Sequence, residues 1–566
     1  MGAPEKAIPA ATGSRRWVRE IAAGSLLFSV CLLLFFYRLG SLSLFDADEP
    51  AYAEAAREML ISGDWITPHF NFQPRFDKPI LFYWLIALAY KGFGIGEYAA
   101  RFWSAVFATG LTLSIYRFGR QLLGQRGACI AALAFATNVG TVILARAAVT
   151  DMTLAFCMTW VLFSFFDIYL TTDKTRERLL FVGYLAMALA VLTKGPIGLL
   201  LPGLIIGLFL VIRRKARATL SRLRLFPGIG LFAVIALPWY LLVLRENGWA
   251  FIQGFFVQHH LNRYLGVVSS HVGSPLYFLP VIVVGFFPWS GTLPNAFSRL
   301  WTIRSRLHAE LTGRQELLLF LWLWCGVVVL FFSFSRTKLP SYIFPAVPAL
   351  ALLAGAAGEA VPDERQPARR WAKAGEWLIG GMACLLAAIF LFLPLIADRI
   401  RLREAPDIPP FDFGFAPYAL AVLLLAGLTV TGAARRRGRE DTAAAAMAGT
   451  MILSIVLAVH QVAPAVQESM QKSLRDIALM ARRELRSVDL VVTYDLNAPS
   501  LVFYSERPVA IVRKGEEAEF QRLAATHERL FIVAKAAAET RLRKIPDIFP
   551  LDRRGGYVLY SSRYHP

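Results

Sequence analysis

The sequence predicts an all-helical, multi-pass membrane domain followed by a small soluble α/β domain. Of the 566 residues, 56% are hydrophobic and only 18% are charged, which is more apolar than an ordinary water-soluble chain. The apolar residues stand in long blocks, and those at 21–37, 195–212 and 317–334 can cross a hydrocarbon layer of roughly 30 Å as helices. No pattern of alternating ten-residue segments recurs, which argues against a membrane β-barrel.

Thirteen segments are predicted to cross the membrane: 20–38, 97–116, 127–146, 152–170, 179–194, 196–212, 226–244, 276–293, 316–334, 341–357, 375–394, 416–434 and 442–460. Basic residues gather in every second connection, which the positive-inside rule places in the cytoplasm. The N-terminus is therefore expected in the cytoplasm and the C-terminus outside. The first segment has no clear cleavage site of the Ala-x-Ala kind, so it is interpreted as an uncleaved span.

An apolar segment at 79–93 decides this topology. The segment is shorter than a normal span. Counting it as a span would place the later basic connections on both sides of the membrane. We therefore expect it to lie along the outer membrane surface, inside a first outer loop that covers about 39–96.

The residues after about 460 differ from the membrane domain of 1–460. Segments 489–494, 508–512 and 529–535 have the composition of strands, and 473–486 and 516–526 have the pattern of amphipathic helices. A soluble α/β domain is therefore expected at 461–566, on the outer side.

Composition also excludes several classes of function. The net charge of +20 does not predict nucleic-acid binding, because the basic residues lie in short connections between spans. The five cysteines all lie in apolar blocks, which predicts neither disulfides nor a metal site. His259 and His260 are adjacent, and this is poor spacing for metal ligands on a helix. No metal and no cofactor are expected.

The first outer loop contains the richest set of polar residues. Pro50 suits an early helical position, and Asp48 or Glu49 can cap the helix that it begins. The two acids could do no more than cap a surface helix. Alternatively they serve a function, because acids packed at a membrane surface are costly. Glu49 and Tyr52 would share one face of this helix.

Other charged residues stand at the outer ends of predicted spans. Lys78 could extend its charge to the lipid headgroups or hold a phosphate at the membrane surface. Lys194 and Lys338 occupy tight outer turns against the positive-inside bias, so they are poor topology signals. Asp151 could be a solvated turn charge, or it could point into a cavity beside Asp48.

Several short motifs occur in one order along residues 40–345. They are Asp48-Glu49, Tyr52-Ala53-Glu54, Arg57-Glu58-Met59-Leu60, Ser62-Gly63-Asp64-Trp65, Phe76-Asp77-Lys78-Pro79, Tyr83-Trp84, Asp151-Met152, Thr193-Lys194-Gly195-Pro196 and Lys338-Leu339-Pro340-Ser341-Tyr342. In this combination the chain resembles the C-type lipid-dependent glycosyltransferases. Among them it is most similar to the lipid A aminoarabinose transferases, within the larger set that includes protein O-mannosyltransferases. Pro50-Ala51 and Asp77 depart from the family pattern.

The resemblance implies the C-type glycosyltransferase fold and a sugar donor carried on undecaprenyl phosphate. It implies transfer of 4-amino-4-deoxy-L-arabinose to phosphate groups of lipid A on the periplasmic face of the bacterial inner membrane, a modification that gives resistance to cationic peptides such as polymyxin. Asp48 and Asp151 would be catalytic. The substrate-binding residues would be Glu49, Tyr52, Lys78, Lys194, Arg263, His271, Lys338 and Tyr342, with the cations stabilising the leaving phosphate.

Two other functions remain as alternatives. The chain could be a C-type transferase that moves another lipid-linked sugar to a protein or glycan hydroxyl, in which case Asp48 would act as a general base. It could also be a transporter or lipid flippase. A transporter should carry ionisable residues near the midplane, whereas here they cluster at the outer ends of the spans.

Overall fold

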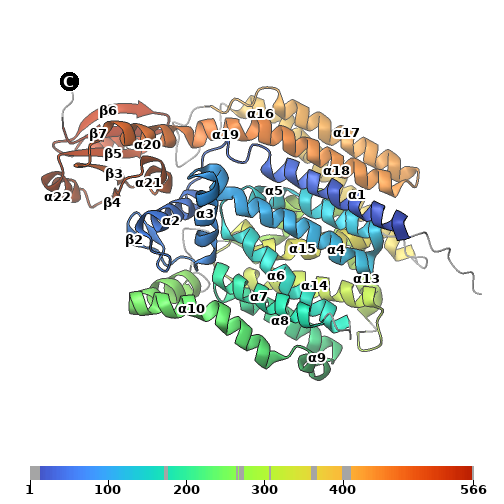
Figure 1. Ribbon diagram of the computed structural model, residues 1–566. Helices are drawn as coiled ribbons and strands as arrows, with labels where there is room; N and C mark the ends of the chain where they lie inside the picture. The colour runs from blue at the N-terminus through green and yellow to red at the C-terminus, as the bar shows by residue number, and fades with distance from the viewer. Residues whose placement is uncertain are drawn as a thin grey trace, which may run out of the picture.

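The computed structural model describes residues 13–170, 176–262, 266, 273–304, 307–358, 366–397 and 410–563. Figure 1 shows a bundle of long helices with a small sheet domain at one end, beside the helix α2. The helices of the bundle are α1 (Gly13–Cys31), α4 (Glu97–Thr137), α5 (Val139–Ala145), α6 (Thr150–Leu170), α7 (Arg176–Lys194), α8 (Ile197–Arg213), α10 (Leu225–Phe251), α12 (Phe278–Gly285), α13 (Leu293–Ile303), α14 (Gly313–Phe334), α15 (Val347–Ala357), α16 (Gln366–Ala397), α17 (Ala416–Arg436) and α18 (Glu440–Leu457). The chain is a multi-pass membrane protein.

A count by helix length and composition alone gives fewer spans than the thirteen that the sequence predicts. Among the described residues, eight helices are long and apolar enough to cross a membrane, or ten if each bent pair counts as one span. The predicted spans 97–116 and 127–146 both lie in α4, which consists of two helices that meet at a break at Gly124 (φ 71°, ψ 179°). A Cβ atom added at Gly119 would lie 3.5 Å from the Cα atom of Ala128, so the chain turns back at Gly124 and the two helices lie side by side. The second helix is followed by a bend of 61° into α5. The predicted spans 179–194 and 196–212 are the helices α7 and α8, which are more charged or shorter than a full span. The lower count therefore arises because the two helices of α4 are counted once and α7 and α8 are left out, and the helices that the sequence predicts in these segments are present.

The segment that decides the predicted topology does not cross the membrane. It forms α3 (Leu81–Phe93), a helix of 13 residues that packs against α2 (Asp48–Ser62) and α4. A Cβ atom added at Gly40 would lie only 2.8 Å from the Cβ atom of Tyr98. The first outer loop therefore leaves the bundle and returns to it at the same place, so it makes no net crossing. The short hairpin of β1 (His69–Phe70) and β2 (Gln73–Pro74) lies between α2 and α3.

The C-terminal domain contains a five-stranded mixed sheet in the order β4-β3-β5-β7-β6. The parallel strands β3 (Asp489–Tyr494), β4 (Val509–Val512) and β5 (Arg529–Lys535) match the three strands that the sequence predicts. The antiparallel pair β6 (Phe549–Arg554) and β7 (Tyr557–Ser561) was not predicted, although Gly555-Gly556 is a turn signal. The helices of this domain are α20 (Lys472–Glu484), α21 (Pro499–Ser505), α22 (Ala518–Thr526) and the single turn α23 (Glu539–Leu542).

The domain shares a hydrophobic core with the first outer loop. Side chains of α20 and α21, including Ile477 and Leu501, belong to the same buried cluster as Met59 of α2 and Phe82 of α3. A separate cluster fills the other face of the sheet, beneath α22. The domain is therefore packed onto the loop that carries the candidate acids. It is entered from α18 through η6 (Ala458–Val462) and α19 (Ala463–Met470).

Candidate active site

Two neighbouring acids begin α2, and they occupy different environments. Asp48 is exposed in the first turn, where a carboxylate is favoured by the positive end of the helix dipole. Glu49 is only 6% exposed. Asp48 is therefore available to a ligand, whereas Glu49 faces the protein interior.

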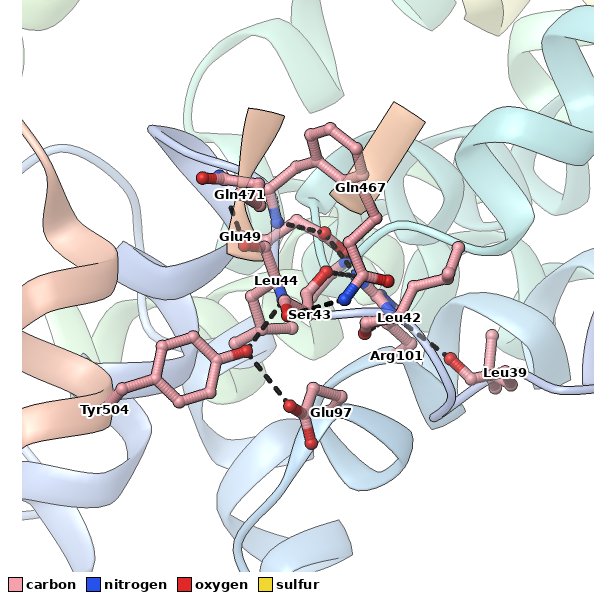
Figure 2. A network of polar contacts seen from close by, with 12 residues as sticks. Leu39, Leu42, Ser43, Leu44, Glu49, Glu97, Arg101, Gln467, Gln471 and Tyr504 are labelled. Atoms are coloured by element: carbon pink, nitrogen blue, oxygen red, sulfur yellow. Dashed lines mark hydrogen bonds and ion pairs between the residues drawn. The ribbon is translucent and has the colours of Figure 1, made fainter. Parts of the chain in front are cut away.

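Glu49 is held by a dense set of hydrogen bonds (Figure 2). Arg101 of α4 donates Nε to its Oε1 at 2.8 Å and Nη2 to its Oε2 at 2.7 Å. The backbone amides of Phe45 and Ala148 also donate to this carboxylate, at 2.9 and 2.7 Å. Burial opposes ionisation, but the Arg101 charge and these hydrogen bonds outweigh it, and the pKa of Glu49 lies below its usual value. The arrangement fixes α2 to the bundle.

A second polar group lies beneath the hairpin. Arg75 Nη2 lies 2.6 Å from Asp77 Oδ2, and His259 Nε2 lies 2.8 Å from Asp77 Oδ1. The Arg75 guanidinium also lies 5.8 Å from the centre of the Tyr52 ring. Burial would raise the pKa of Asp77, but the His259 hydrogen bond and the Arg75 charge hold it well below its usual range. His259 belongs to η2 (Ile252–Asn262), which continues from α10, so this contact joins the first outer loop to the end of that helical segment.

Tyr52 lies between Asp48 and this second group. Its buried phenol is within electrostatic range of Asp48, Arg75, Asp77 and Tyr83, and burial raises its pKa well above the usual value. Lys78 follows Asp77 directly, is partly buried, and donates Nζ to the carbonyl oxygen of Asp77 at 2.9 Å. The first loop therefore brings Asp48, Tyr52 and Lys78 into one region.

A third group lies where α6, α7 and η5 (Pro340–Ala346) meet. Lys194 Nζ lies 2.9 Å from Asp151 Oδ1 and 5.8 Å from the centre of the Tyr342 ring. Asp151 stands in the first turn of α6, and Ala148 just before it donates to Glu49. The structure thus brings Asp151, Lys194 and Tyr342 together and connects them to the start of α2.

Lys338 has a different environment from the other candidate cations. Its side chain is buried, and its Nζ donates to the carbonyl oxygens of Phe332, Ser333 and Ser335, at 3.2 and 2.7 Å for the first two. Burial lowers the pKa of Lys338. In this structure Lys338 closes the C-terminal end of α14, where a cation complements the free carbonyls.

Two of the expected substrate-binding residues, Arg263 and His271, lie outside the described residues. Within the described parts of the chain, no three His, Cys, Asp or Glu side chains are grouped so that they could hold a metal ion. The sequence analysis did not select Arg75 or Arg101 as parts of the site. Arg101 gave a signal that could have been used, because a charged residue inside a predicted span usually has a specific partner.

Known proteins resemble this chain in sequence and in overall fold. The family model described as dolichyl-phosphate-mannose-protein mannosyltransferase matches residues 77–241. An undecaprenyl phosphate-alpha-4-amino-4-deoxy-L-arabinose arabinosyl transferase of Pseudomonas fluorescens is 29% identical over 86% of this chain and 83% of its own length. One of Pseudomonas aeruginosa is 32% identical over 66% of this chain and 65% of its own length. The crystal structure of ArnT from Cupriavidus metallidurans bound to undecaprenyl phosphate has a TM-score of 0.80 at 28% identity, covering 98% of this chain and 99% of that one.

These matches and the helical bundle define the class of the protein. It is a membrane-embedded glycosyltransferase that uses a polyprenyl-phosphate sugar donor. Within that class, the chain belongs to the family of undecaprenyl phosphate–aminoarabinose arabinosyltransferases. This is the family that the motifs of the first outer loop indicate.

Proposed function

We propose that the protein transfers 4-amino-4-deoxy-L-arabinose from undecaprenyl phosphate to the phosphate groups of lipid A. The observation that carries the proposal is the convergence of an exposed acid, Asp48, with Tyr52, Arg75, Asp77 and Lys78 at the membrane end of the first loop. A lipid-linked sugar would reach this region from the bilayer. The modification would reduce the negative charge of lipid A and so give resistance to cationic peptides such as polymyxin.

The transfer is a single displacement at the anomeric carbon of the sugar. A phosphate oxygen of lipid A attacks this carbon, and the bond from the carbon to the phosphate oxygen of the donor breaks. The bonding electron pair leaves with undecaprenyl phosphate, which becomes a dianion. The nucleophile is already an anion, so no proton needs to be removed from it. A single displacement of this kind inverts the configuration of the anomeric carbon.

The residues of the chain have two tasks in this scheme. Cations stabilise the charge that grows on the leaving phosphate, and Lys78 is the main candidate, with Lys194, Lys338 and Arg263 as further candidates. Carboxylates bind the ammonium group of the sugar and stabilise the oxocarbenium character of the transition state. We assign this second task to Asp48 and Asp151, with Glu49, Tyr52, His271 and Tyr342 lining or supporting the donor site.

Sidedness forms part of the same proposal. The sheet domain, α2 and α3 face the periplasm, and the N-terminus lies in the cytoplasm of a bacterium, with the bundle in the inner membrane. This orientation is supported by the basic residues in every second connection and by the position of the first loop at a single end of the bundle.

The test combines purified protein with undecaprenyl phosphate–aminoarabinose and lipid A, and mass spectrometry measures the added sugar. The Asp48→Asn variant should insert and fold normally but lose transfer by about 100-fold or more, because an electrostatic contact to the transition state is removed. Asp412→Asn is a matched control. Asp412 is exposed and lies outside the first loop, and the asparagine side chain can still accept the hydrogen bond from the Gly414 backbone amide.

Near-normal transfer by a well-inserted Asp48→Asn protein would refute the role of Asp48. Transfer of a neutral sugar, such as mannose, from its polyprenyl phosphate without transfer of aminoarabinose would instead refute the proposed substrate.

A further inference from the structure

The segment that leads into α2 is held from three sides. The bundle holds it through Arg101, which donates to the carbonyl oxygens of Leu42 and Ser43 at 2.7 and 2.8 Å. The connection before α6 holds it through the Ala148 amide and Glu49. The third side is the C-terminal domain, which comes from more than 400 positions further along the chain.

The domain contacts this segment through several side chains (Figure 2). The Leu44 amide donates to the Tyr504 hydroxyl at 2.9 Å, and the same hydroxyl donates to Glu97 at 3.0 Å. Gln467 Nε2 donates to the Ser43 hydroxyl at 2.9 Å. The segment between the first membrane helix and α2 therefore packs against the C-terminal domain as well as against the bundle.

The contact nearest to Asp48 is made by Asp46. The Ser500 amide donates to Asp46 Oδ1 at 2.8 Å, and the Ser500 hydroxyl donates to Asp46 Oδ2. Asp46 is separated from Asp48 by Ala47 alone, which joins the contact directly to the first turn of α2. Ser500 belongs to α21, a helix whose residues are all buried, so the partner of Asp46 stands on a firmly packed element.

We propose that Asp46 and Ser500 are positioning residues for the transfer reaction: their contact sets the start of α2 and thereby the place of Asp48 at the donor. The C-terminal domain then takes part in catalysis without touching substrate. The inference rests on the proposed role of Asp48. It goes further by assigning a task to the domain and by naming the residues through which the task is done.

Geometry gives the reason to expect a kinetic effect. Asp48 is exposed, and within the described parts of the chain its side chain makes no hydrogen bond. Its position therefore depends on the backbone of α2 and on the segment before it. A displacement of about 1 Å at a catalytic group can reduce turnover by about 100-fold, whereas the affinity for a long lipid donor depends on many contacts elsewhere. Loss of the contact should therefore act on kcat.

The experiment compares variants that alter this contact with a control that alters another contact of the same domain. Asp46→Ala should lower kcat by about 10- to 100-fold with KM for the lipid-linked sugar changed by less than about threefold. Ser500→Ala, which keeps the amide donor, should give a smaller loss in the same direction. Ser500→Thr keeps both the amide and the hydroxyl donor, and its kcat should stay near the wild-type value.

Asn71→Gly provides the matched control. Asn71 exchanges two hydrogen bonds of 2.8 Å with the backbone of Val509, so it also joins the first loop to the domain, but at the tip of the hairpin. Its φ of 56° is tolerated by glycine. Asn71→Gly should leave kcat within about twofold of wild type while lowering the thermal midpoint as much as Ser500→Ala.

Equal losses of kcat in Asn71→Gly and Ser500→Ala would overturn the proposal, because docking alone would then explain both. An effect of Asp46→Ala and Ser500→Ala on KM alone would also overturn it. All variants are compared with wild type on whichever polyprenyl-phosphate sugar the wild type turns over. Failure of aminoarabinose transfer by the wild type is thus separated from failure of the positioning role.

Discussion

At the scale of the residue, the most informative pair is Asp48 and Glu49. The sequence places both acids at the start of a surface helix, and the family resemblance implies a catalytic role for Asp48 and a binding role for Glu49. Their environments differ because Arg101, which lies on another helix, pairs with Glu49 alone. Local patterns do not reveal a partner so distant in sequence, so the pairing of Glu49 with Arg101 could not be predicted, and the role of Glu49 in binding substrate stays a prediction.

The Glu49–Arg101 pair should contribute strongly to folding. Glu49→Ala leaves the Arg101 guanidinium buried without its counter-charge, and removing one partner of a buried ion pair typically destabilises by about 3–5 kcal/mol. Thermal unfolding in detergent should show a large fall in the midpoint. The double variant Glu49→Leu/Arg101→Met should recover only part of the loss: no isolated charge remains, but the backbone amides that donate to Glu49 and the carbonyls that accept from Arg101 lose their partners. A midpoint unchanged in Glu49→Ala would contradict this account.

At the scale of the element, the sequence predicted helices and strands well and their packing poorly. The short apolar segment 79–93 was recognised as a non-spanning helix because basic connections constrain parity. The two predicted spans 97–116 and 127–146 are the two helices that meet at the break at Gly124 in α4, so the sequence placed this turn correctly. The hairpin β6–β7 was missed because β6 is mostly exposed and ends in Arg553 and Arg554, so it lacks a clear apolar face, although its partner β7 is mostly buried.

α2 carries a second buried acid that should make stability depend on pH. Glu58 is 3% exposed, its Oε2 accepts from the Phe72 amide at 3.0 Å, and burial together with the neighbouring Glu54 carboxylate raises its pKa from 4.5 to about 7. The folded protein therefore binds a proton at Glu58 more tightly than the unfolded chain does. The free energy of unfolding should fall as pH rises from about 4.5 to about 7. Above about pH 7, Glu58 should cause no further change in it.

Glu58→Gln should remove this dependence. The amide carries no charge near Glu54 and still accepts from the Phe72 amide, so the variant should be more stable than wild type at about pH 8 and similar to it at about pH 5. Thermal midpoints measured at both pH values test the prediction. Parallel pH profiles for wild type and variant would show that Glu58 does not titrate in this window.

At the scale of the whole molecule, the division at residue 460 describes composition better than it describes packing. The sequence predicted a membrane domain and a soluble domain, and both are present. The shared cluster that includes Met59, Phe82, Ile477 and Leu501 crosses the division, and so do the contacts of Asp46 and Asn71. No pattern within either part predicts this interface, because its apolar members, Met59, Phe82, Ile477 and Leu501, also suit an ordinary core position.

This shared core predicts that the two parts unfold together. All 13 tryptophans precede residue 461, so tryptophan fluorescence reports only on the membrane part. Leu530 is fully buried in the cluster on the far face of the sheet, away from the interface, and Leu530→Ala should destabilise the domain by about 2–5 kcal/mol. If unfolding is cooperative, the midpoint measured by tryptophan fluorescence should fall as well. Leu530→Met, which conserves volume, should have a small effect. Rapid proteolysis of the C-terminal domain with an unchanged tryptophan midpoint would instead show two independent units, and the path of the segment before Asp48 would then have to be set by the bundle alone.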